Sequence, residues 1–229
     1  MFDDVRSKKI VLVAHCLLNQ NSISDGTADR ASQFDEIVEL LMANHLGMIQ
    51  MPCPELVCLG LGRGDADGSK RPLLEENTRI RELLGEPRHV ATLRRKAEDL
   101  VAQIRQYEAY GFQVLGVIGV DRSPSCGVAT TSRGGAEVPG KGVFLEVLSE
   151  TLAEHEITLP MIGTKTHEPE ASLERVKCST PTSRIVLYMI WGSTPSSGDS
   201  SSQVKLNSTP LGASSLIIAG DTFKNGLNG

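Results

Sequence analysis

The chain has 229 residues and a mass of 24.6 kDa, which suits one generous domain, or one domain with an appendage, and disfavours two full domains. A formal net charge of -5 without any basic run disfavours a nucleic-acid polymer as the main partner. A content of 40% hydrophobic but only 4% aromatic residues indicates a core of aliphatic side chains and excludes a wholly disordered or collagen-like chain.

The expected compartment is the cytoplasm. The first residues, MFDDVRSKK, carry acids and lack a long apolar segment, so we expect no secretory signal. The longest apolar runs, 10–14 and 185–191, are far shorter than the roughly 20 residues of a membrane span, so no membrane partner is expected. The five cysteines are scattered and odd in number, which argues against a disulfide framework.

The first half of the chain predicts two strands around one helix. Residues 9–14 (KIVLVA) form a β-branched apolar run, and the polar residues 19–30 predict a loop. A helix is predicted from residue 32, because its apolar residues recur at helical spacing: Phe34, Ile37, Val38 and Leu41. A second strand over 48–53 ends at a cysteine, and the Gly-, Asp- and Arg-rich residues 59–72 predict a loop.

The second half continues the alternation. One or two helices are predicted over 75–111, the later one with a buried stripe of Val90, Leu93, Ala97, Leu100, Ile104 and Tyr107. Residues 112–120 are nearly all apolar, as in a strand covered on both faces. A Gly-rich loop over 132–142 precedes a helix whose apolar face is Phe144, Val147, Leu148 and Leu152, and residues 157–162 predict a fourth strand.

This alternation of strands and helices predicts an α/β fold, a three-layer sandwich with a mainly parallel, Rossmann-like sheet. We expect a single domain over residues 1–178. Residues 179–229, rich in Ser, Gly, Thr and Pro, are expected to form a low-complexity C-terminal appendage outside that domain.

Three cysteines follow three predicted strands. Cys16 follows the first strand, Cys53 the second and Cys126 the third. The carboxyl ends of parallel strands lie along one edge of the sheet, where ligands bind, so these thiols are expected to meet. Cysteines are also common as small buried hydrophobes, and that interpretation competes for each of them singly.

Converging thiols favour a soft metal: zinc, Cu(I) or an iron–sulfur cluster. A closed zinc site usually has paired short spacings such as C-x₂-C, which this chain lacks. Three thiolates on a four-iron cubane would leave one iron open to a substrate atom.

Three motifs carry a resemblance to a known family. The strings AHCLLNQNS (14–22), PCPE (52–55) and DRSPSCGV (121–128) occur in that order, each after a strand. Together they resemble the motifs of the TudS family of 2-thiouracil desulfurases. Asn19 stands where the better-known members have Gly, so the chain is more similar to a variant desulfidase subgroup.

The resemblance implies a [4Fe-4S] cluster held by Cys16, Cys53 and Cys126, with Glu55 and Ser123 as acid–base and water-positioning residues. It further implies hydrolytic removal of sulfur, as hydrogen sulfide, from a thiolated small molecule such as a thiopyrimidine. Glu55 at a helix N-terminus and Ser123 in a turn also have purely structural interpretations. Ser125 is the alternative hydroxyl.

Other functions compete with a desulfidase. A non-catalytic iron–sulfur sensor or sulfur carrier would need a fourth ligand, either Cys58 or another group, and a metal-free binding domain would simply bury its thiols. GAEVPGKG (135–142) nearly matches a phosphate-binding loop, but Gly142 replaces the Ser or Thr that holds Mg²⁺. We expect Arg63, in GLGRGD, to be a solvated loop charge rather than an anion ligand, and His15 to be a possible substrate contact.

Overall fold

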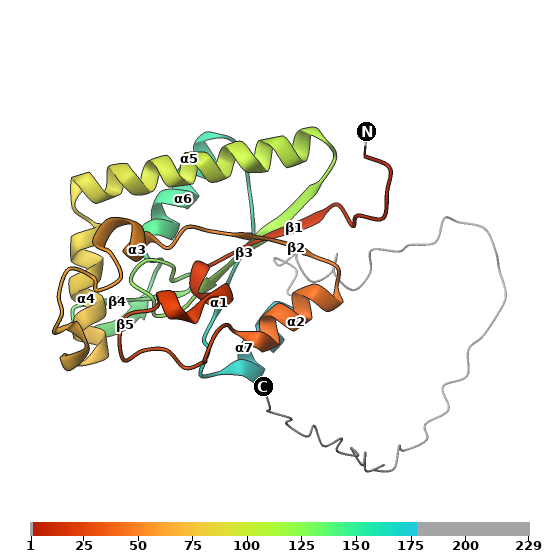
Figure 1. Cartoon of the computed structure of the whole chain (residues 1–229). Coiled ribbons are helices and arrows are strands. Elements are labelled where there is room, and N and C mark those ends of the chain that lie inside the picture. The colour runs from red at the N-terminus through yellow and green to blue at the C-terminus, as the bar shows by residue number, and fades with distance from the viewer. Residues whose placement is uncertain (1, 178–229) are drawn as a thin grey trace, which may run out of the picture. The chain divides into compact units, whose positions relative to one another are not determined.

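Four parallel strands form the central sheet in the computed structural model, which describes residues 2–177 (Figure 1). The order is β2-β1-β3-β6, with bounds Lys9–Val13 for β1, Gly47–Gln50 for β2, Gln113–Val120 for β3 and Met161–Thr164 for β6. All three pairings are parallel, so the predicted α/β class is confirmed. The expected domain end at 178 and the appendage 179–229 lie outside the described residues.

Helices cover both faces of the sheet. The long helix α5 (Pro87–Ala109) packs on α6 (Val143–Glu154), and α2 (Asp35–Ala43) packs on α7 (Pro169–Lys177). Figure 1 shows the first pair above the sheet and the second pair below it. The remaining helical elements are short or peripheral: α1 (His15–Leu18), η1 (Gln20–Ser22), α3 (Pro54–Leu59), η2 (Gly68–Lys70) and α4 (Leu73–Leu84).

The predicted helical stripes are largely confirmed as core. The four apolar positions predicted around α2 and the four in α6 are all buried, and so are Leu93, Ala97, Leu100 and Ile104 of α5. The predicted region 75–111 contains two helices. They separate at Gly85 and Glu86, because Pro87 has no backbone N–H and a fixed φ that suits the first helical position.

The Gly-rich loop predicted over 132–142 is wrong in part. Residues Thr130–Arg133 (β4) and Ala136–Pro139 (β5) form an antiparallel hairpin that packs on α4. Gly134 and Gly135 connect them with φ values of 60° and 73°, the left-handed conformation that a two-residue hairpin turn requires. The Gly-Gly pair was the available signal, but its flanking runs are short and only weakly apolar.

The fourth strand begins later than predicted, at Met161 rather than at 157. Pro160 has no N–H to donate to a ladder, although its carbonyl accepts a 2.9 Å bond from the N–H of Val117. Short helical turns η1 and η2 also interrupt the loops predicted over 19–30 and 59–72.

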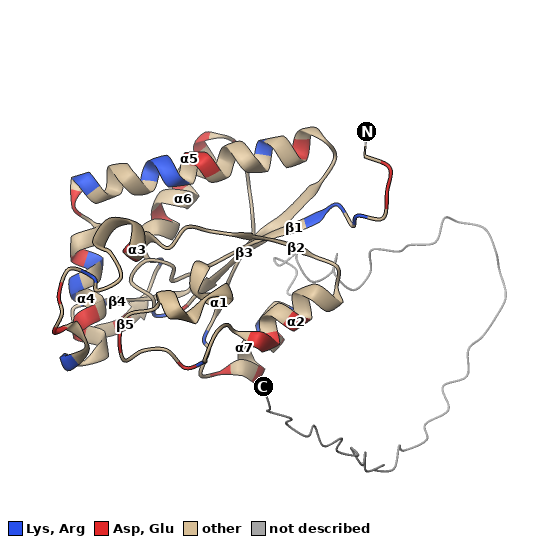
Figure 2. Cartoon of the chain, viewed as in Figure 1, with Lys and Arg blue, Asp and Glu red and all other residues tan. Residues whose placement is uncertain are grey.

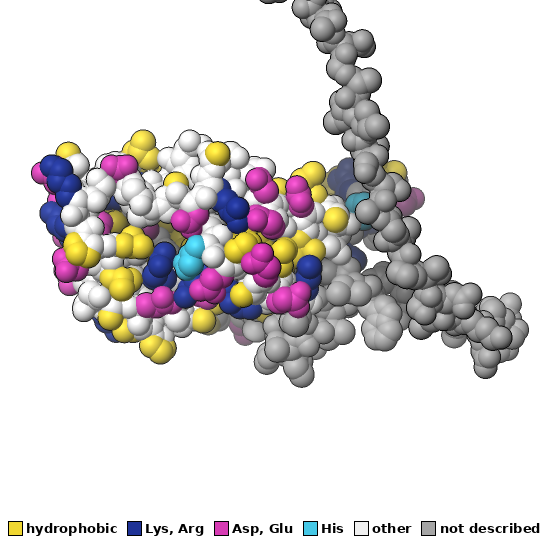
Figure 3. All heavy atoms as spheres, turned by 90° about the horizontal axis from the view of Figure 1, so that it is seen from below, with side chains coloured by type: hydrophobic (Ala, Val, Ile, Leu, Met, Phe, Trp, Pro, Cys, Tyr) yellow, Lys and Arg dark blue, Asp and Glu magenta, His cyan; other side chains and the backbone are white. Residues whose placement is uncertain are grey.

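Charged side chains of both signs alternate along the outer helices, most visibly on α5, whereas α1 carries none (Figure 2). The face seen from below likewise mixes acidic, basic and hydrophobic side chains (Figure 3). Every helix within residues 2–177 is too short or too polar to cross a bilayer.

Candidate active site

The three neighbouring strands β2, β1 and β3 each lead into a cysteine at the same edge of the sheet. Cys16 lies in α1 directly after β1, Cys53 precedes α3 after β2, and Cys126 lies in the turn after β3. In the sheet, β2 lies on one side of β1 and β3 lies on the other, so the strand order changes direction at β1. Open parallel sheets bind ligands at such a switch point.

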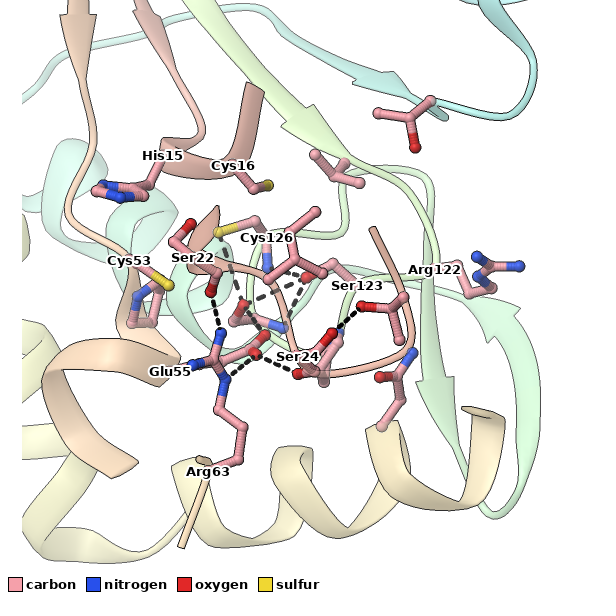
Figure 4. A pocket seen from close by; sticks show the side chains of 18 of the residues that line it. His15, Cys16, Ser22, Ser24, Cys53, Glu55, Arg63, Arg122, Ser123 and Cys126 are labelled. Carbon is pink, nitrogen blue, oxygen red and sulfur yellow. Dashed lines mark hydrogen bonds and ion pairs between the residues drawn. The ribbon is translucent and has the colours of Figure 1, made fainter. Parts of the chain in front are cut away.

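One cavity of about 110 Å³ is lined by all three cysteines together with Glu55 and Ser123. Figure 4 shows the three sulfur atoms on one side of this cavity, above the Glu55 carboxylate. The predicted convergence of the thiols is therefore confirmed, while their role as ligands stays a prediction. Cys58, the candidate fourth ligand, does not line this cavity.

The thiols lie in an environment that opposes their ionisation. Burial, followed by the charges of Cys53 and Glu55, raises the pKa of Cys16 to about 12. Burial, followed by the charges of the other two cysteines, raises the pKa of Cys126 well above its ordinary value, and burial also raises that of Cys53. A bound metal reverses this preference, because a coordinating thiol loses its proton.

Thiols are the donor type that soft metals select, whether a single zinc ion or an iron–sulfur cluster. A single zinc ion would need each sulfur about 2.3 Å from the metal. Within the described part of the chain, no three His, Cys, Asp or Glu side chains are grouped closely enough to hold a metal ion. A four-iron cluster, in contrast, distributes its thiolate ligands over different irons.

Glu55 lies in the first turn of α3 and is 8% exposed. It therefore stands at a helix N-terminus and lines the cavity at the same time. Its Oε1 accepts a 2.8 Å bond from the hydroxyl of Ser125, and its Oε2 accepts a 2.8 Å bond from Nε of Arg63. Pro54 at the first helical position and the Cys53 sulfur, which accepts a bond from the N–H of Leu56, begin this helix.

Ser123 and Ser125 divide the roles expected of one hydroxyl. The Ser123 Oγ accepts bonds from the N–H groups of Ser125 and Cys126, at 3.3 and 3.0 Å, so it stabilises the turn that presents Cys126. Ser125 is buried, contacts Glu55 directly, and lies 3.2 Å from the Ser123 hydroxyl. Ser123 was the predicted residue and Ser125 the alternative. Motif spacing alone does not show which hydroxyl faces the carboxylate.

Asp121 shapes the loop that carries Cys126. Its Oδ1 accepts bonds from the N–H groups of Val128, Ala129 and Thr130, at 3.2, 2.8 and 3.4 Å. The aspartate of DRSPSCGV thus closes the loop on itself, a contribution that the sequence analysis did not identify.

The apparent phosphate-binding loop has a different purpose. The N–H groups of Val143 and Phe144, at the start of α6, donate 3.0 Å bonds to the carbonyls of Pro124 and Ser125. A Cβ on Gly142 would lie 2.4 Å from the carbonyl carbon of Ser125. Gly142 therefore permits close packing on the cysteine loop, and the α6 amides that a phosphate would need already bind the chain's own carbonyls.

Arg63 is not the solvated loop charge that the sequence predicted. It is 3% exposed, lines the cavity and pairs with Glu55. His15 lines the same cavity, and burial followed by the charge of Arg63 lowers its pKa. The Gly-rich context of Arg63 was misleading, because the loop folds back over the site instead of extending into solvent.

No known protein-family model matches the chain. It is 29% identical over 124 residues to an uncharacterised protein of Methanocaldococcus jannaschii, an alignment that covers 54% of this chain and 70% of that protein. Among solved structures, the [4Fe-4S]-dependent thiouracil desulfidase TudS aligns with 72% of this chain and 96% of its own length, at 20% identity and a TM-score of 0.36.

Proposed function

We propose that this protein is a cytoplasmic [4Fe-4S]-dependent desulfidase that hydrolyses a thiolated small molecule, of the thiopyrimidine class, and releases hydrogen sulfide. The observation that carries the proposal is the meeting of Cys16, Cys53 and Cys126 with Glu55 in one cavity at the sheet's switch point. The three motifs that resemble the TudS family contain these same residues, which supports the proposal.

The three cysteines would hold the cluster. When bound through three thiolates, such a cluster supplies one iron with a free coordination position, which favours a soft sulfur and makes the carbon next to it electrophilic. The remaining chemistry belongs to the side chains of the cavity.

The reaction exchanges sulfur for oxygen without a change of oxidation state. The oxygen of water forms a bond to the thiocarbonyl carbon, the bond from that carbon to sulfur breaks, and both water protons leave with sulfur as hydrogen sulfide. Glu55 is the proposed general base, because its carboxylate lines the cavity. It can take one proton from the attacking water and pass that proton to the departing sulfur.

The two serines support this base. Ser125 has one hydroxyl proton, and it uses this proton in the hydrogen bond to Glu55. The bond holds the Oε1 atom of Glu55 in place. The Ser123 hydroxyl, half-buried beside it in the cavity wall, is the proposed contact for the attacking water. A cavity of about 110 Å³ suits a small molecule rather than a polymer as the partner.

The test is an anaerobic screen of the iron-reconstituted full chain against 2-thiouracil, other thiolated bases and nucleosides, and thioamides, with sulfide release as the readout. We expect release from at least one thiolated pyrimidine, and none with the metal-free chain or the Cys16→Ser variant. Protein that binds a cluster but releases no sulfide from any of these compounds would contradict the desulfidase proposal, and protein that binds no iron would contradict the cofactor.

A further inference from the structure

Arg63 has a backbone conformation that its residue type disfavours. Its φ is 53°, in the left-handed region where a side chain is sterically costly and glycine is preferred. Its neighbours Gly62 and Gly64 show that the loop has glycines available, yet an arginine stands at this position. Contacts of the side chain must therefore offset the cost of the backbone.

The guanidinium makes those contacts inside the protein. Its Nε donates a 2.8 Å bond to Glu55, and its Nη1 donates bonds of 3.1 and 3.0 Å to the carbonyls of Gly60 and Leu61. Its Nη2 donates to the carbonyl of Ser22. Four acceptors thus surround a group with five N–H donors, at an exposure of only 3%.

These four bonds join two segments of the site. Ser22 lies in η1, shortly after Cys16, whereas Gly60 and Leu61 follow the helix that begins after Cys53. Figure 4 shows the guanidinium between Ser22 and the Glu55 carboxylate, below the sulfur atoms. Arg63 therefore fixes the loop after the first cysteine to the helix after the second.

The same group fixes the carboxylate. Ser125 holds Oε1 and Arg63 holds Oε2, each at 2.8 Å, so the plane of the Glu55 carboxylate is set from both ends. Arg63 also lines a neighbouring hollow of about 380 Å³, as do Ser24, Thr27, Leu73 and Asn77 of the same cavity wall.

We propose that Arg63 is a positioning residue for the desulfidase reaction: through its bond to Oε2 it holds the general base Glu55 in its productive orientation. This inference rests on the proposed function. A lysine cannot replace the arginine, because an ammonium group is a compact charge that cannot reach four acceptors spread around a planar fork.

The experiment compares Arg63→Met and Arg63→Lys in the full, iron-reconstituted chain, with 2-thiouracil or the best substrate of the screen. We expect both variants to keep the iron content and visible spectrum of the wild type. We expect kcat to fall about 100-fold in Arg63→Met, the scale of a displaced catalytic group, with KM changed less than about threefold. Arg94→Met is the control, since Arg94 is likewise paired with acidic side chains, those of Glu98 and Glu154, but lies outside the site.

A double-variant comparison separates positioning through Glu55 from other effects. Because Arg63 acts through Glu55, adding Arg63→Met to Glu55→Gln should lower the residual rate no further. Unchanged kcat in Arg63→Met, loss of the cluster in Arg63→Lys, or multiplicative losses in the double variant would each overturn the proposal.

A second measurement uses the metal-free chain and does not depend on catalysis. We expect urea unfolding to show that the double variant loses less stability than the sum of the two single variants, because each single change leaves one buried charge without its partner. Additive losses would overturn the Arg63–Glu55 coupling. If the wild type releases no sulfide but the coupling is present, the proposed function has failed while the contact itself stands.

Discussion

The hydroxyl of Ser125 donates a 2.8 Å hydrogen bond to Oε1 of Glu55, across 70 positions of the chain. This bond joins the loop after β3 to the helix after β2, and so connects the second and third cysteine motifs. It also makes Ser125, rather than Ser123, the hydroxyl in direct contact with the proposed base. Alanine variants of the two serines should therefore differ in their effects on the rate of sulfide release and on the free energy of unfolding.

Replacing Ser125 by alanine should lower the rate of sulfide release by about 10- to 100-fold, the value of a hydrogen bond to a charged group, with the cluster retained. Ser123→Ala should remove the proposed contact for the attacking water and, in addition, lower the free energy of unfolding by about 1–2 kcal/mol, because the N–H groups of Ser125 and Cys126 lose their acceptor. Sulfide assays and urea unfolding measure the two effects. Equal losses of rate without loss of stability would contradict this division of roles.

Each of the variants Cys16→Ser, Cys53→Ser and Cys126→Ser should abolish the brown colour of the anaerobically reconstituted protein, because a hydroxyl is a poor substitute for a soft thiolate. Cys58→Ser is the control and should keep the colour, since Cys58 does not line the cavity. Iron content and visible absorption are the measurements. A cluster retained in all three variants would remove the cysteines from the metal site.

Glu55→Gln should keep the cluster and lower the rate of sulfide release by about 10²- to 10⁴-fold, the usual contribution of a general base. Glu98→Gln, on the outer helix α5, is the matched control and should leave the rate unchanged. Steady-state kinetics with equal iron loading provide the comparison. Undiminished turnover in Glu55→Gln would exclude it as the base.

Gly142→Ser restores the sequence of a phosphate-binding loop but should destabilise the protein by about 1–3 kcal/mol, the usual cost of overpacking, because its Cβ would meet the Ser125 backbone. Gly62→Ala is the control, since a Cβ there meets no atom within 4 Å. Thermal unfolding measures the difference, and nucleotide binding should remain absent. A stable Gly142→Ser protein would show that this close approach is not required.

Glu76 should make stability depend on acid pH. Hydrogen bonds from Arg79 and then Arg71 hold the pKa of Glu76 below its ordinary value of 4.5, although burial opposes them. A carboxyl group whose pKa is lower in the folded state than in the unfolded state stabilises the fold at pH values above its unfolded-state pKa. This contribution is lost as the pH falls through the folded-state pKa. The Glu76→Gln variant should therefore have a lower free energy of unfolding than the wild type at neutral pH. Between about pH 5 and pH 3, its free energy of unfolding, measured with urea, should decrease less than that of the wild type. An unchanged pH dependence would contradict this contribution.

The elements that build the sheet could be predicted because their signals are local. Hydrophobic periodicity placed the helices, the apolar run 112–120 placed the buried strand, and the position of each cysteine after a strand predicted their meeting. The hairpin β4–β5 and the start of β6 were mispredicted, since short strands with few apolar residues differ little from loops.

The parallel α/β framework and the edge at which three thiols gather could both be predicted from the order of residues, because they need only the alternation of strands and helices and the common direction of parallel strands. The tertiary structure alone decided which hydroxyl contacts Glu55, that Arg63 is buried against it, and that Gly142 serves packing. Those outcomes depend on contacts between segments up to 70 positions apart, and no local pattern of residue types specifies how such segments pack.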